Sequence, residues 1–293
     1  MPEGNEVHRW AERHTKAFVG RRMHVEGPNG RFEDAGALDG RRLERVLAVG
    51  KHLGYDFGKD RILHVHLGRY GDWTEGQMPL DEVRGMLRLR MWRMGARSVK
   101  GAKRSAGRHY STDDGSANLE PETVDWVELR GPTDCSVYTQ ERWDALLKRL
   151  GPDPLNGDEP AAAFRKIGKA KKPIGVLLME QDVMSGIGNI YRAELLFRAR
   201  LSPFVLGSEV SFKTLKGIWK EARPLLEAGM VDRRIVTTLR EHRPHGEETP
   251  PLKQEVHYVY RRHGKPCWVC GETVLKRDMA GRSLYWCPTC QAE

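Results

Sequence analysis

The spacing of hydrophobic residues changes along the chain, and the change marks two kinds of structure. Apolar positions from Val7 to Phe18 recur every three or four residues, which predicts a helix over residues 2–18. Between residues 21 and 97 the runs become short and extended, with glycine turns between them. Strands are predicted at residues 23–25, 43–49, 52–57, 62–67, 86–94 and 124–129. The pattern therefore predicts an N-terminal β-sandwich of two packed sheets with a leading helix.

The helical period returns near Arg142 and dominates the next ninety residues. Helices are predicted at residues 142–150, 160–170, 173–184, 189–200 and 211–228. The charged, proline-containing tract 231–255 is predicted to be a linker, and residues 98–121 either a hairpin extension or a plain loop. The fold class is thus α+β and multidomain, with domains at residues 1–130, 131–255 and 256–293.

Charge narrows the choice of partner. The 293 residues carry a formal net charge of +9, which favours a polyanion, first nucleic acid and second an anionic membrane. No apolar run reaches membrane-spanning length. The N-terminus has no hydrophobic signal segment, so we expect a cytoplasmic protein that does not bind membranes.

Four cysteines near the C-terminus have the spacing of a metal site. Cys267 and Cys270 form one C-x-x-C pair, and Cys287 and Cys290 form another sixteen residues later. Two such turns on a hairpin complete a tetrahedral zinc site. All four positions are protein ligands, so the predicted zinc is structural; two disulfides are the alternative. No role is predicted for the fifth cysteine, Cys135.

The first residues could carry covalent chemistry. If Met1 is removed, Pro2 bears a secondary amine beside the carboxyl group of Glu3. An amine can attack a carbonyl-like carbon and hold it as a Schiff base, while a carboxyl group moves protons. The alternative is structural, because proline and an acidic residue both favour a helix start.

Two further segments could bind phosphate. Gly186-Ile187-Gly188-Asn189 separates two predicted helices, and its backbone N–H groups with the Asn189 amide could cradle a phosphate. Asn189 could equally be an ordinary helix N-cap. Lys172 ends a basic cluster upstream, and Arg282 lies between the two cysteine pairs, where it could grip a phosphate or face solvent.

Taken together, the chain resembles the formamidopyrimidine-DNA glycosylase / endonuclease VIII family over nearly its whole length. The motifs that carry the resemblance are Met-Pro-Glu-Gly at residues 1–4, Gly-Lys-His-Leu at 50–53, His-Leu-Gly at 66–68, Gly-Pro-Asp-Pro-Leu at 151–155, Gly-Ile-Gly-Asn-Ile-Tyr at 186–191, and Gly-Arg-Ser at 281–283 with the cysteines. The first and fourth of these are most similar to the endonuclease VIII branch, particularly its actinobacterial-type members.

The resemblance implies a β-sandwich, a helix-two-turn-helix domain and a zinc finger, with one structural Zn²⁺ and no redox or nucleotide cofactor. It implies removal of oxidised bases followed by strand cleavage through β,δ-elimination. The implied roles are nucleophile for Pro2, general acid for Glu3, β-elimination and phosphate contact for Lys51, phosphate grip and δ-elimination for Arg282, phosphate binding for Asn189 and support for Glu6. The implied partner is damaged DNA, double-stranded or single-stranded, bound by a monomer at the bacterial nucleoid.

One segment departs from the family pattern. The residues that fill the gap left by an extruded nucleotide would be Gly68, Arg69 and Tyr70, but an apolar residue is usual where Arg69 stands. Tyr70 could instead pack in a core. We predict oxidised pyrimidines as substrates, with oxidised purines as the alternative.

Two non-catalytic hypotheses remain weaker. A DNA-damage-binding protein without activity predicts loss of Pro2, Glu3 or Lys51, and all three are present. A zinc-ribbon adaptor accounts for the C-terminus but leaves the first 200 residues unexplained.

Overall fold

The computed structural model describes residues 2–97, 104–105 and 123–292. The chain divides into two compact units. The first contains Pro2 and Glu6–Lys148, and the second contains Glu3–Asn5 and Arg149–Glu293. The chain start is therefore shared, because the short stretch after Pro2 packs with the second unit.

The first unit is a sandwich of two antiparallel sheets. One sheet has the order β1-β6-β8-β5-β7 and the other the order β2-β3-β4-β9. The strands are β1 (Met23–Glu26), β2 (Arg45–Val49), β3 (His52–Asp56), β4 (Ile62–His66), β5 (Asp72–Gly76), β6 (Leu87–Arg93), β7 (Arg104–Ser105), β8 (Trp126–Arg130) and β9 (Asp134–Tyr138). The helices of this unit are α1 (Gly4–Phe18), α2 (Ala35–Leu38) and α3 (Gln140–Leu147), and Pro28–Gly30 forms a 3-10 turn.

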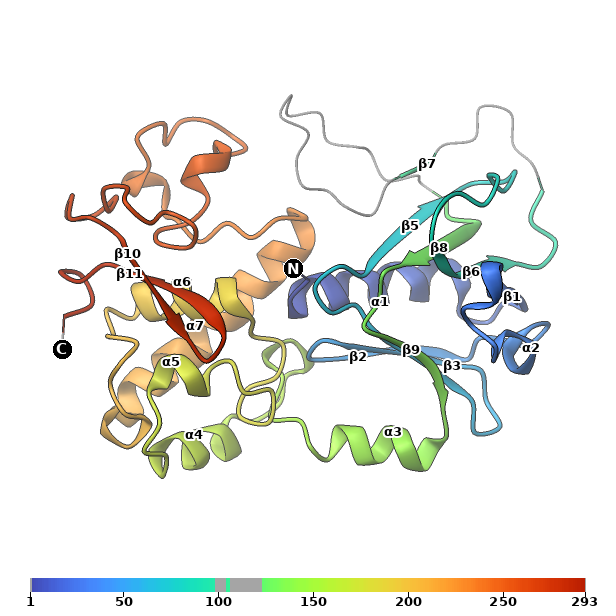
Figure 1. The fold of residues 1–293 in the computed structure, drawn as a ribbon, viewed down its shortest axis with the longest axis horizontal. Coiled ribbons are helices and arrows are strands. Elements are labelled where there is room, and N and C mark those ends of the chain that lie inside the picture. The colour runs from blue at the N-terminus through green and yellow to red at the C-terminus, as the bar shows by residue number, and fades with distance from the viewer. Residues whose placement is uncertain (1, 98–103, 106–122, 293) are drawn as a thin grey trace. The chain divides into compact units, whose positions relative to one another are not determined.

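Helix α1 supplies the centre of the sandwich core. Trp10 and Phe18 on its apolar face pack in one cluster with Leu53 of β3 and Trp73 of β5, so both sheets contact the helix (Figure 1). Helix α3 covers the other face of the β2-β3-β4-β9 sheet through Trp143. The predicted leading helix and two-sheet sandwich are thereby confirmed.

Two strands in the first unit were not predicted. Both β5 and β9 are five residues long and rich in polar residues, so neither shows an apolar run. Strand β9 pairs with β4 along its full length, and the first unit therefore extends to Lys148 rather than ending at residue 130. The predicted hairpin extension at 98–121 lies outside the described residues, apart from β7, which pairs with β5.

The second unit is built around one buried helix. Helix α6 (Asn189–Arg198) packs against α5 (Ile174–Leu177), α7 (Phe212–Val231) and the last strand of a hairpin (Figure 1). Its other elements are α4 (Ala161–Gly168), strands β10 (Leu275–Met279) and β11 (Arg282–Trp286), and 3-10 turns at Pro154–Asn156, Gly207–Glu209, Arg240–His242 and Lys253–Glu255. The predicted helices at 160–170, 189–200 and 211–228 are confirmed.

The helix predicted at 173–184 is wrong beyond residue 177. Helix α5 has only four residues, and the chain then turns. The side chain of Gln181 explains the turn, because its Nε2 donates to the carbonyl groups of Met179 and Ile187 and its Oε1 accepts from the Gly186 N–H. These bonds replace the ladder that a longer helix would need.

The predicted linker 231–255 is packed rather than extended. Thr237, Thr238 and Glu255 are buried, and the backbone N–H of Thr237 donates to the carbonyl of Val256 at 2.8 Å. None of the described helices is both long and apolar enough to cross a membrane.

Candidate functional site

Glu3 is the centre of the most constrained polar contact in the second unit. Its buried carboxylate accepts N–H groups from Gly188 at 2.9 Å, Ile190 at 2.7 Å and Tyr191 at 3.2 Å. These groups form the N-terminus of α6, where orphan N–H donors and the helix dipole favour negative charge. The contact therefore holds the Glu3 carboxylate at a fixed point directly after Pro2.

Glycines make this approach possible. A Cβ atom at Gly188 would lie 2.3 Å from Cδ of Glu3, and one at Gly4 would lie 2.9 Å from Cα of Gly186. The backbone N–H of Gly4 donates to the carbonyl of Gly186 at 2.8 Å. The glycines of the 186–189 turn thus leave room for residues 3 and 4 to pack against the backbone of the turn.

This geometry corrects the expected phosphate cradle. The N–H group of Gly188 in this turn binds the Glu3 carboxylate, as do the N–H groups of Ile190 and Tyr191 in the first turn of α6, so these donors are not open to a phosphate. The glycine spacing in the sequence identified the turn correctly but could not show that its anion belongs to the same chain.

Asn189 links α6 to the hairpin that carries Arg282. Its Nδ2 donates to the Ser283 carbonyl at 2.9 Å, and its Oδ1 accepts from the guanidinium of Arg192. Arg192 is fully buried and also donates to the Gly175 carbonyl at 3.1 Å. Burial lowers the pKa of Arg192 to about 10, with the Glu3 charge opposing the shift and the Arg282 charge adding to it. Sequence reasoning missed Arg192, although its i, i+3 spacing from Asn189 was a visible signal.

Arg282 is exposed at the first position of β11. The hairpin turn before it has left-handed backbone at both central residues, with φ of +53° at Ala280 and +70° at Gly281. Such a two-residue turn matches the twist of the strands and fixes their register, pairing Met279 with Arg282. The backbone that carries the Arg282 guanidinium is therefore held in one conformation by the hairpin.

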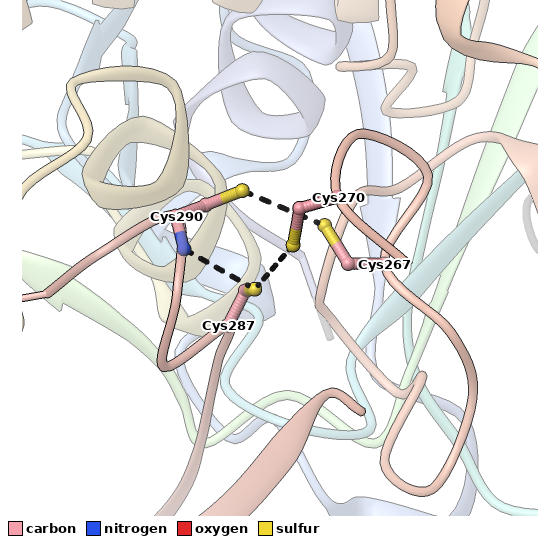
Figure 2. Close-up of side chains that lie close together, drawn as sticks. All are labelled: Cys267, Cys270, Cys287 and Cys290. Carbon is pink, nitrogen blue, oxygen red and sulfur yellow. Dashed lines mark hydrogen bonds between the residues drawn. The ribbon is translucent and has the colours of Figure 1, made fainter. Parts of the chain in front are cut away.

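The four predicted ligand cysteines come together at the base of this hairpin. Figure 2 shows their side chains converging, and all four sulfur atoms lie within 4.8 Å of one another. The separations are 3.9 Å between Cys267 and Cys290 and 3.4 Å between Cys270 and Cys287, too long for disulfides. Four thiolates about 2.3 Å from one zinc lie about 3.8 Å apart, so the cluster fits a structural Zn²⁺.

Lys51 lies in the first unit, in the two-residue turn between β2 and β3. Gly50 before it has φ of +59°, the conformation that glycine supplies at the first central position of a hairpin turn. Burial, and then the nearby Lys51 charge, lower the pKa of His66 on the adjoining strand. Lys51 therefore stands beside an imidazole cluster that sequence reasoning did not identify.

The comparisons with known proteins agree with one another. The formamidopyrimidine-DNA glycosylase N-terminal domain matches residues 1–105, the H2TH domain of that enzyme matches 150–240, and the zinc finger found in FPG and IleRS matches 264–292. Endonuclease 8 1 of Mycobacterium tuberculosis is 38% identical, over 99% of this chain and 100% of the relative. The chain belongs to the formamidopyrimidine-DNA glycosylase and endonuclease VIII family. It is thus a DNA glycosylase with AP lyase activity that serves base excision repair.

Other relatives and solved structures support the same fold. The formamidopyrimidine-DNA glycosylase of Thermus thermophilus is 30% identical, over 100% of this chain and 99% of the relative. The crystal structure of the MutM (Fpg) protein from that organism covers 100% of this chain and 99% of its own with a TM-score of 0.72 at 26% identity. A complex of Lactococcus lactis Fpg with DNA containing an abasic site covers 99% and 100% with a TM-score of 0.73; at 20% identity it shows the fold alone.

The remaining predicted site residues of this glycosylase either are exposed or form an ion pair with a neighbouring side chain. Tyr70 is 62% exposed, with the Arg69 guanidinium 5.5 Å from its ring centre, so it does not pack in the core. Lys172 pairs with Glu180 at 2.6 Å, a hydrogen bond that raises the Lys172 pKa. Glu6 accepts from Arg9 at 2.7 Å within α1.

Cys135 belongs to the sandwich core of the first unit. Burial raises its thiol pKa to about 12, which makes it a poor nucleophile.

Proposed function

We propose that this DNA glycosylase removes oxidised pyrimidines through a Schiff base at Pro2 and then cleaves the strand by β,δ-elimination. Pro2 attacks C1′ of an extruded nucleotide, the base leaves, and the cationic imine acidifies the C2′ proton. Loss of that proton expels the 3′ phosphate, and a second elimination expels the 5′ phosphate. The family explains glycosylase activity in general, whereas the nucleophile and the lesion class are the proposal.

The anchored carboxylate of Glu3 is the observation that carries the proposal. An ionised carboxylate next to the chain start can accept the proton that the Pro2 ammonium must lose before it attacks. The same carboxyl group can then donate the proton to the sugar ring oxygen as the ring opens. The three N–H bonds fix its position for both steps.

Lys51, Asn189 and Arg282 are proposed to hold the phosphates flanking the lesion. Arg282 is exposed and suits direct contact. Asn189 already binds Ser283 next to Arg282, so part of its role is to hold the hairpin in place. The Lys172 ammonium would have to exchange Glu180 for DNA, which makes its contribution the smallest of these cations.

Lesion preference rests on the branch of the family. The relative at 38% identity is called Endonuclease 8 1, whereas the one at 30% is a formamidopyrimidine-DNA glycosylase. The first comparison favours oxidised pyrimidines, and the second keeps oxidised purines as an alternative. Exposed Tyr70 supports a wedge that replaces the extruded nucleotide by stacking on its neighbours.

Borohydride trapping on DNA containing an abasic site tests the nucleophile. The mature protein should form a covalent adduct that Pro2→Gly abolishes, whereas the same exchange at a turn in the first unit, Pro28→Gly, should leave the adduct intact. Intact-protein mass should show Met1 absent in the reactive form. Unchanged trapping by Pro2→Gly would contradict the proposal.

Paired substrates test the lesion. Thymine glycol should be released faster than 8-oxoguanine from otherwise identical duplexes under single-turnover conditions. The opposite order would assign the enzyme to oxidised purines while leaving the nucleophile in place.

A further inference from the structure

Helix α6 carries a fully buried guanidinium that forms no ion pair with a carboxylate among the described residues. Arg192 donates instead to two neutral oxygens, the carbonyl of Gly175 at 3.1 Å and Oδ1 of Asn189, and its Nε meets no acceptor in the described part of the chain. A buried charge without a carboxylate destabilises a protein unless its hydrogen bonds compensate. These two bonds are therefore what Arg192 contributes, and one of them reaches a proposed phosphate-binding residue.

The bond from Arg192 fixes how the Asn189 amide is turned. Arginine has N–H donors and no acceptor, so the Asn189 atom that faces it must be the oxygen. Burial lowers the pKa of Arg192 only to about 10, so the group remains a charged donor at neutral pH. The NH₂ group of Asn189 then faces the hairpin, where Nδ2 donates to the Ser283 carbonyl at 2.9 Å. A reversed amide would place two donors together at Arg192 and two acceptors together at Ser283.

This orientation leaves one donor of Asn189 for another partner. The NH₂ group has two N–H bonds, and within the described residues only the one to Ser283 is used. The N-cap of α6 is Gly188, so the Asn189 side chain does not cap the helix. The N–H groups of Gly188 and Ile190, on either side of Asn189, hold the carboxylate of Glu3. The second donor of Asn189 thus lies beside the residue that follows the proposed nucleophile.

The bond to Ser283 also ties the hairpin to α6. Ser283 directly follows Arg282 and pairs with Asp278 of β10, and strand β11 packs against α6. A reversed Asn189 amide would repel the Ser283 carbonyl, and the exposed Arg282 guanidinium would move with it. One amide therefore controls both a phosphate donor of its own and the placement of a second phosphate-binding side chain.

We infer that Arg192 is a positioning residue that turns the Asn189 amide, so that one N–H bond holds the Arg282 hairpin and the other is presented to a phosphate of the DNA backbone. The inference rests on the proposed phosphate contacts of Asn189 and Arg282. Arg192 is itself fully buried and cannot contact DNA, so its effect passes through Asn189.

A double-mutant cycle on DNA affinity tests the inference. The probe is a duplex that carries tetrahydrofuran, a stable analogue of an abasic site, so no chemistry at Pro2 is needed. Arg192→Met and Asn189→Ala should each weaken binding about tenfold, and the double variant should bind no more weakly than Asn189→Ala. Losses that multiply, or wild-type affinity of Arg192→Met, would overturn the inference.

A second arginine of α6 supplies the matched control. Arg198 donates to Glu221 and to the Thr237 carbonyl instead, so Arg198→Met should bind the duplex like the wild type. An equal loss in Arg198→Met would mean that the affinity reports only helix packing, and the inference would be wrong. Urea unfolding shows whether each variant is folded at the assay temperature. If Arg192→Met does not fold, Arg192→Lys replaces it in the cycle with the same criteria, because an ammonium keeps the charge but lacks the fork that reaches both oxygens.

A change in the DNA tests whether the ligand of Asn189 is a phosphate. A methylphosphonate removes the charge at one phosphate, and it is placed in turn on each side of the tetrahydrofuran. At one of these positions the wild type should lose about tenfold in affinity, because a hydrogen bond to a charged acceptor is lost, whereas Asn189→Ala and Arg192→Met should lose less than about threefold. Equal losses in all three proteins at both positions would contradict the inference.

The outcomes separate this inference from the proposed function. If the wild-type protein forms no borohydride adduct while the affinity cycle behaves as expected, the Schiff-base proposal fails and the role of Arg192 stands. If the adduct forms but Asn189→Ala binds like the wild type, the nucleophile stands and the inference about Arg192 is wrong.

Discussion

Helix α6 meets two buried carboxylates that are bound in the same way and serve different ends. Glu3 comes from the chain start and accepts three backbone N–H groups at the N-terminus of the helix. Glu194 comes from the helix itself and accepts the N–H groups of Tyr258 at 2.7 Å, Val259 at 2.9 Å and Tyr260 at 2.8 Å. Both side chains are almost completely buried.

The difference lies in what each carboxylate fixes. Glu3 holds the residue that follows the proposed nucleophile, whereas Glu194 holds the segment that leads into the zinc finger and also accepts from the Thr237 hydroxyl. A buried carboxylate with several N–H donors is thus no sign of catalysis by itself. The two carboxylates differ only in what lies next to them, which is the proposed nucleophile for Glu3 and a structural segment for Glu194.

The largest expected effect comes from making the same change at both positions. Glu3→Gln and Glu194→Gln each replace an accepting oxygen by an NH₂ group facing N–H donors, and each should cost roughly 1–3 kcal/mol of stability. Glu3→Gln should also lower single-turnover base release about a thousandfold, because the proton carrier is lost. Glu194→Gln should stay within about tenfold of the wild type when measured below its unfolding temperature.

Base release from a lesion-containing duplex, alongside urea unfolding of each variant, checks this contrast. Equal loss of activity in the two variants would mean that Glu3 acts only by holding the fold.

The next largest effect is expected for removal of the Glu194 side chain. Glu194→Ala leaves three backbone N–H groups without their acceptor and should destabilise the protein by about 3–4 kcal/mol, although the Thr237 hydroxyl keeps the Val256 carbonyl at 3.2 Å. Urea unfolding measures this loss, and Glu221→Ala is the control, because Glu221 on α7 is partly exposed and is paired with the side chain of Arg198 rather than with buried backbone N–H groups. A loss at Glu194 no larger than that at Glu221 would show that water replaces the carboxylate.

A smaller effect is expected where the helix start meets Glu3. Gly188→Ala places a methyl group 2.3 Å from Cδ of Glu3, so the carboxylate must shift, at a cost of about 2 kcal/mol. Gly217→Ala in α7 meets no atom within 4 Å and should be neutral or slightly stabilising. Unfolding and base release of both variants check the contrast; wild-type behaviour of Gly188→Ala would mean that the contact is loose.

The local spacing of apolar residues and cysteines predicted much of this structure. Helix α1 and the apolar strands were legible because each has a periodic apolar face, and the zinc site because both cysteine pairs are short-range. Strand β9 was missed because alternate positions carry polar residues: Asp134, which binds His64 of β4, and Ser136, whose hydroxyl donates to Asp134.

Polar contacts between residues far apart in the chain could not be predicted from the sequence. Nothing in the spacing of residues 186–191 shows that Glu3, more than 180 positions earlier, occupies their N–H groups. The same holds for Glu194, which resembled an ordinary charged residue in a helix.

The last expected effect, no larger than that of Gly188→Ala, concerns His14, a buried histidine that its surroundings keep uncharged. His14 on α1 is fully buried among Trp10, Phe18 and Trp73, and its Nδ1 lies 2.7 Å from the Tyr55 hydroxyl. Burial, followed by the charges of Arg9 and Arg13, lowers its pKa to about 3. Its Nε2 meets no acceptor among the described residues, so the folded protein keeps the ring neutral.

The sign of the pH effect follows from this depressed pKa. The unfolded chain protonates His14 below about pH 6.5, whereas the folded protein does not until about pH 3. Its contribution to stability is therefore complete above pH 6.5 and is lost as the pH falls, by about 2 kcal/mol between pH 7 and pH 5.

His14→Phe should be less stable than the wild type at pH 7, because Tyr55 loses a partner, but should lose about 2 kcal/mol less on acidification to pH 5. Urea unfolding at pH 7, 6 and 5 measures both slopes, and the other histidines cancel because they are present in both proteins. If the stability of both proteins fell equally with pH, the His14 ring would take up its proton inside the folded protein, and its burial would not keep it neutral.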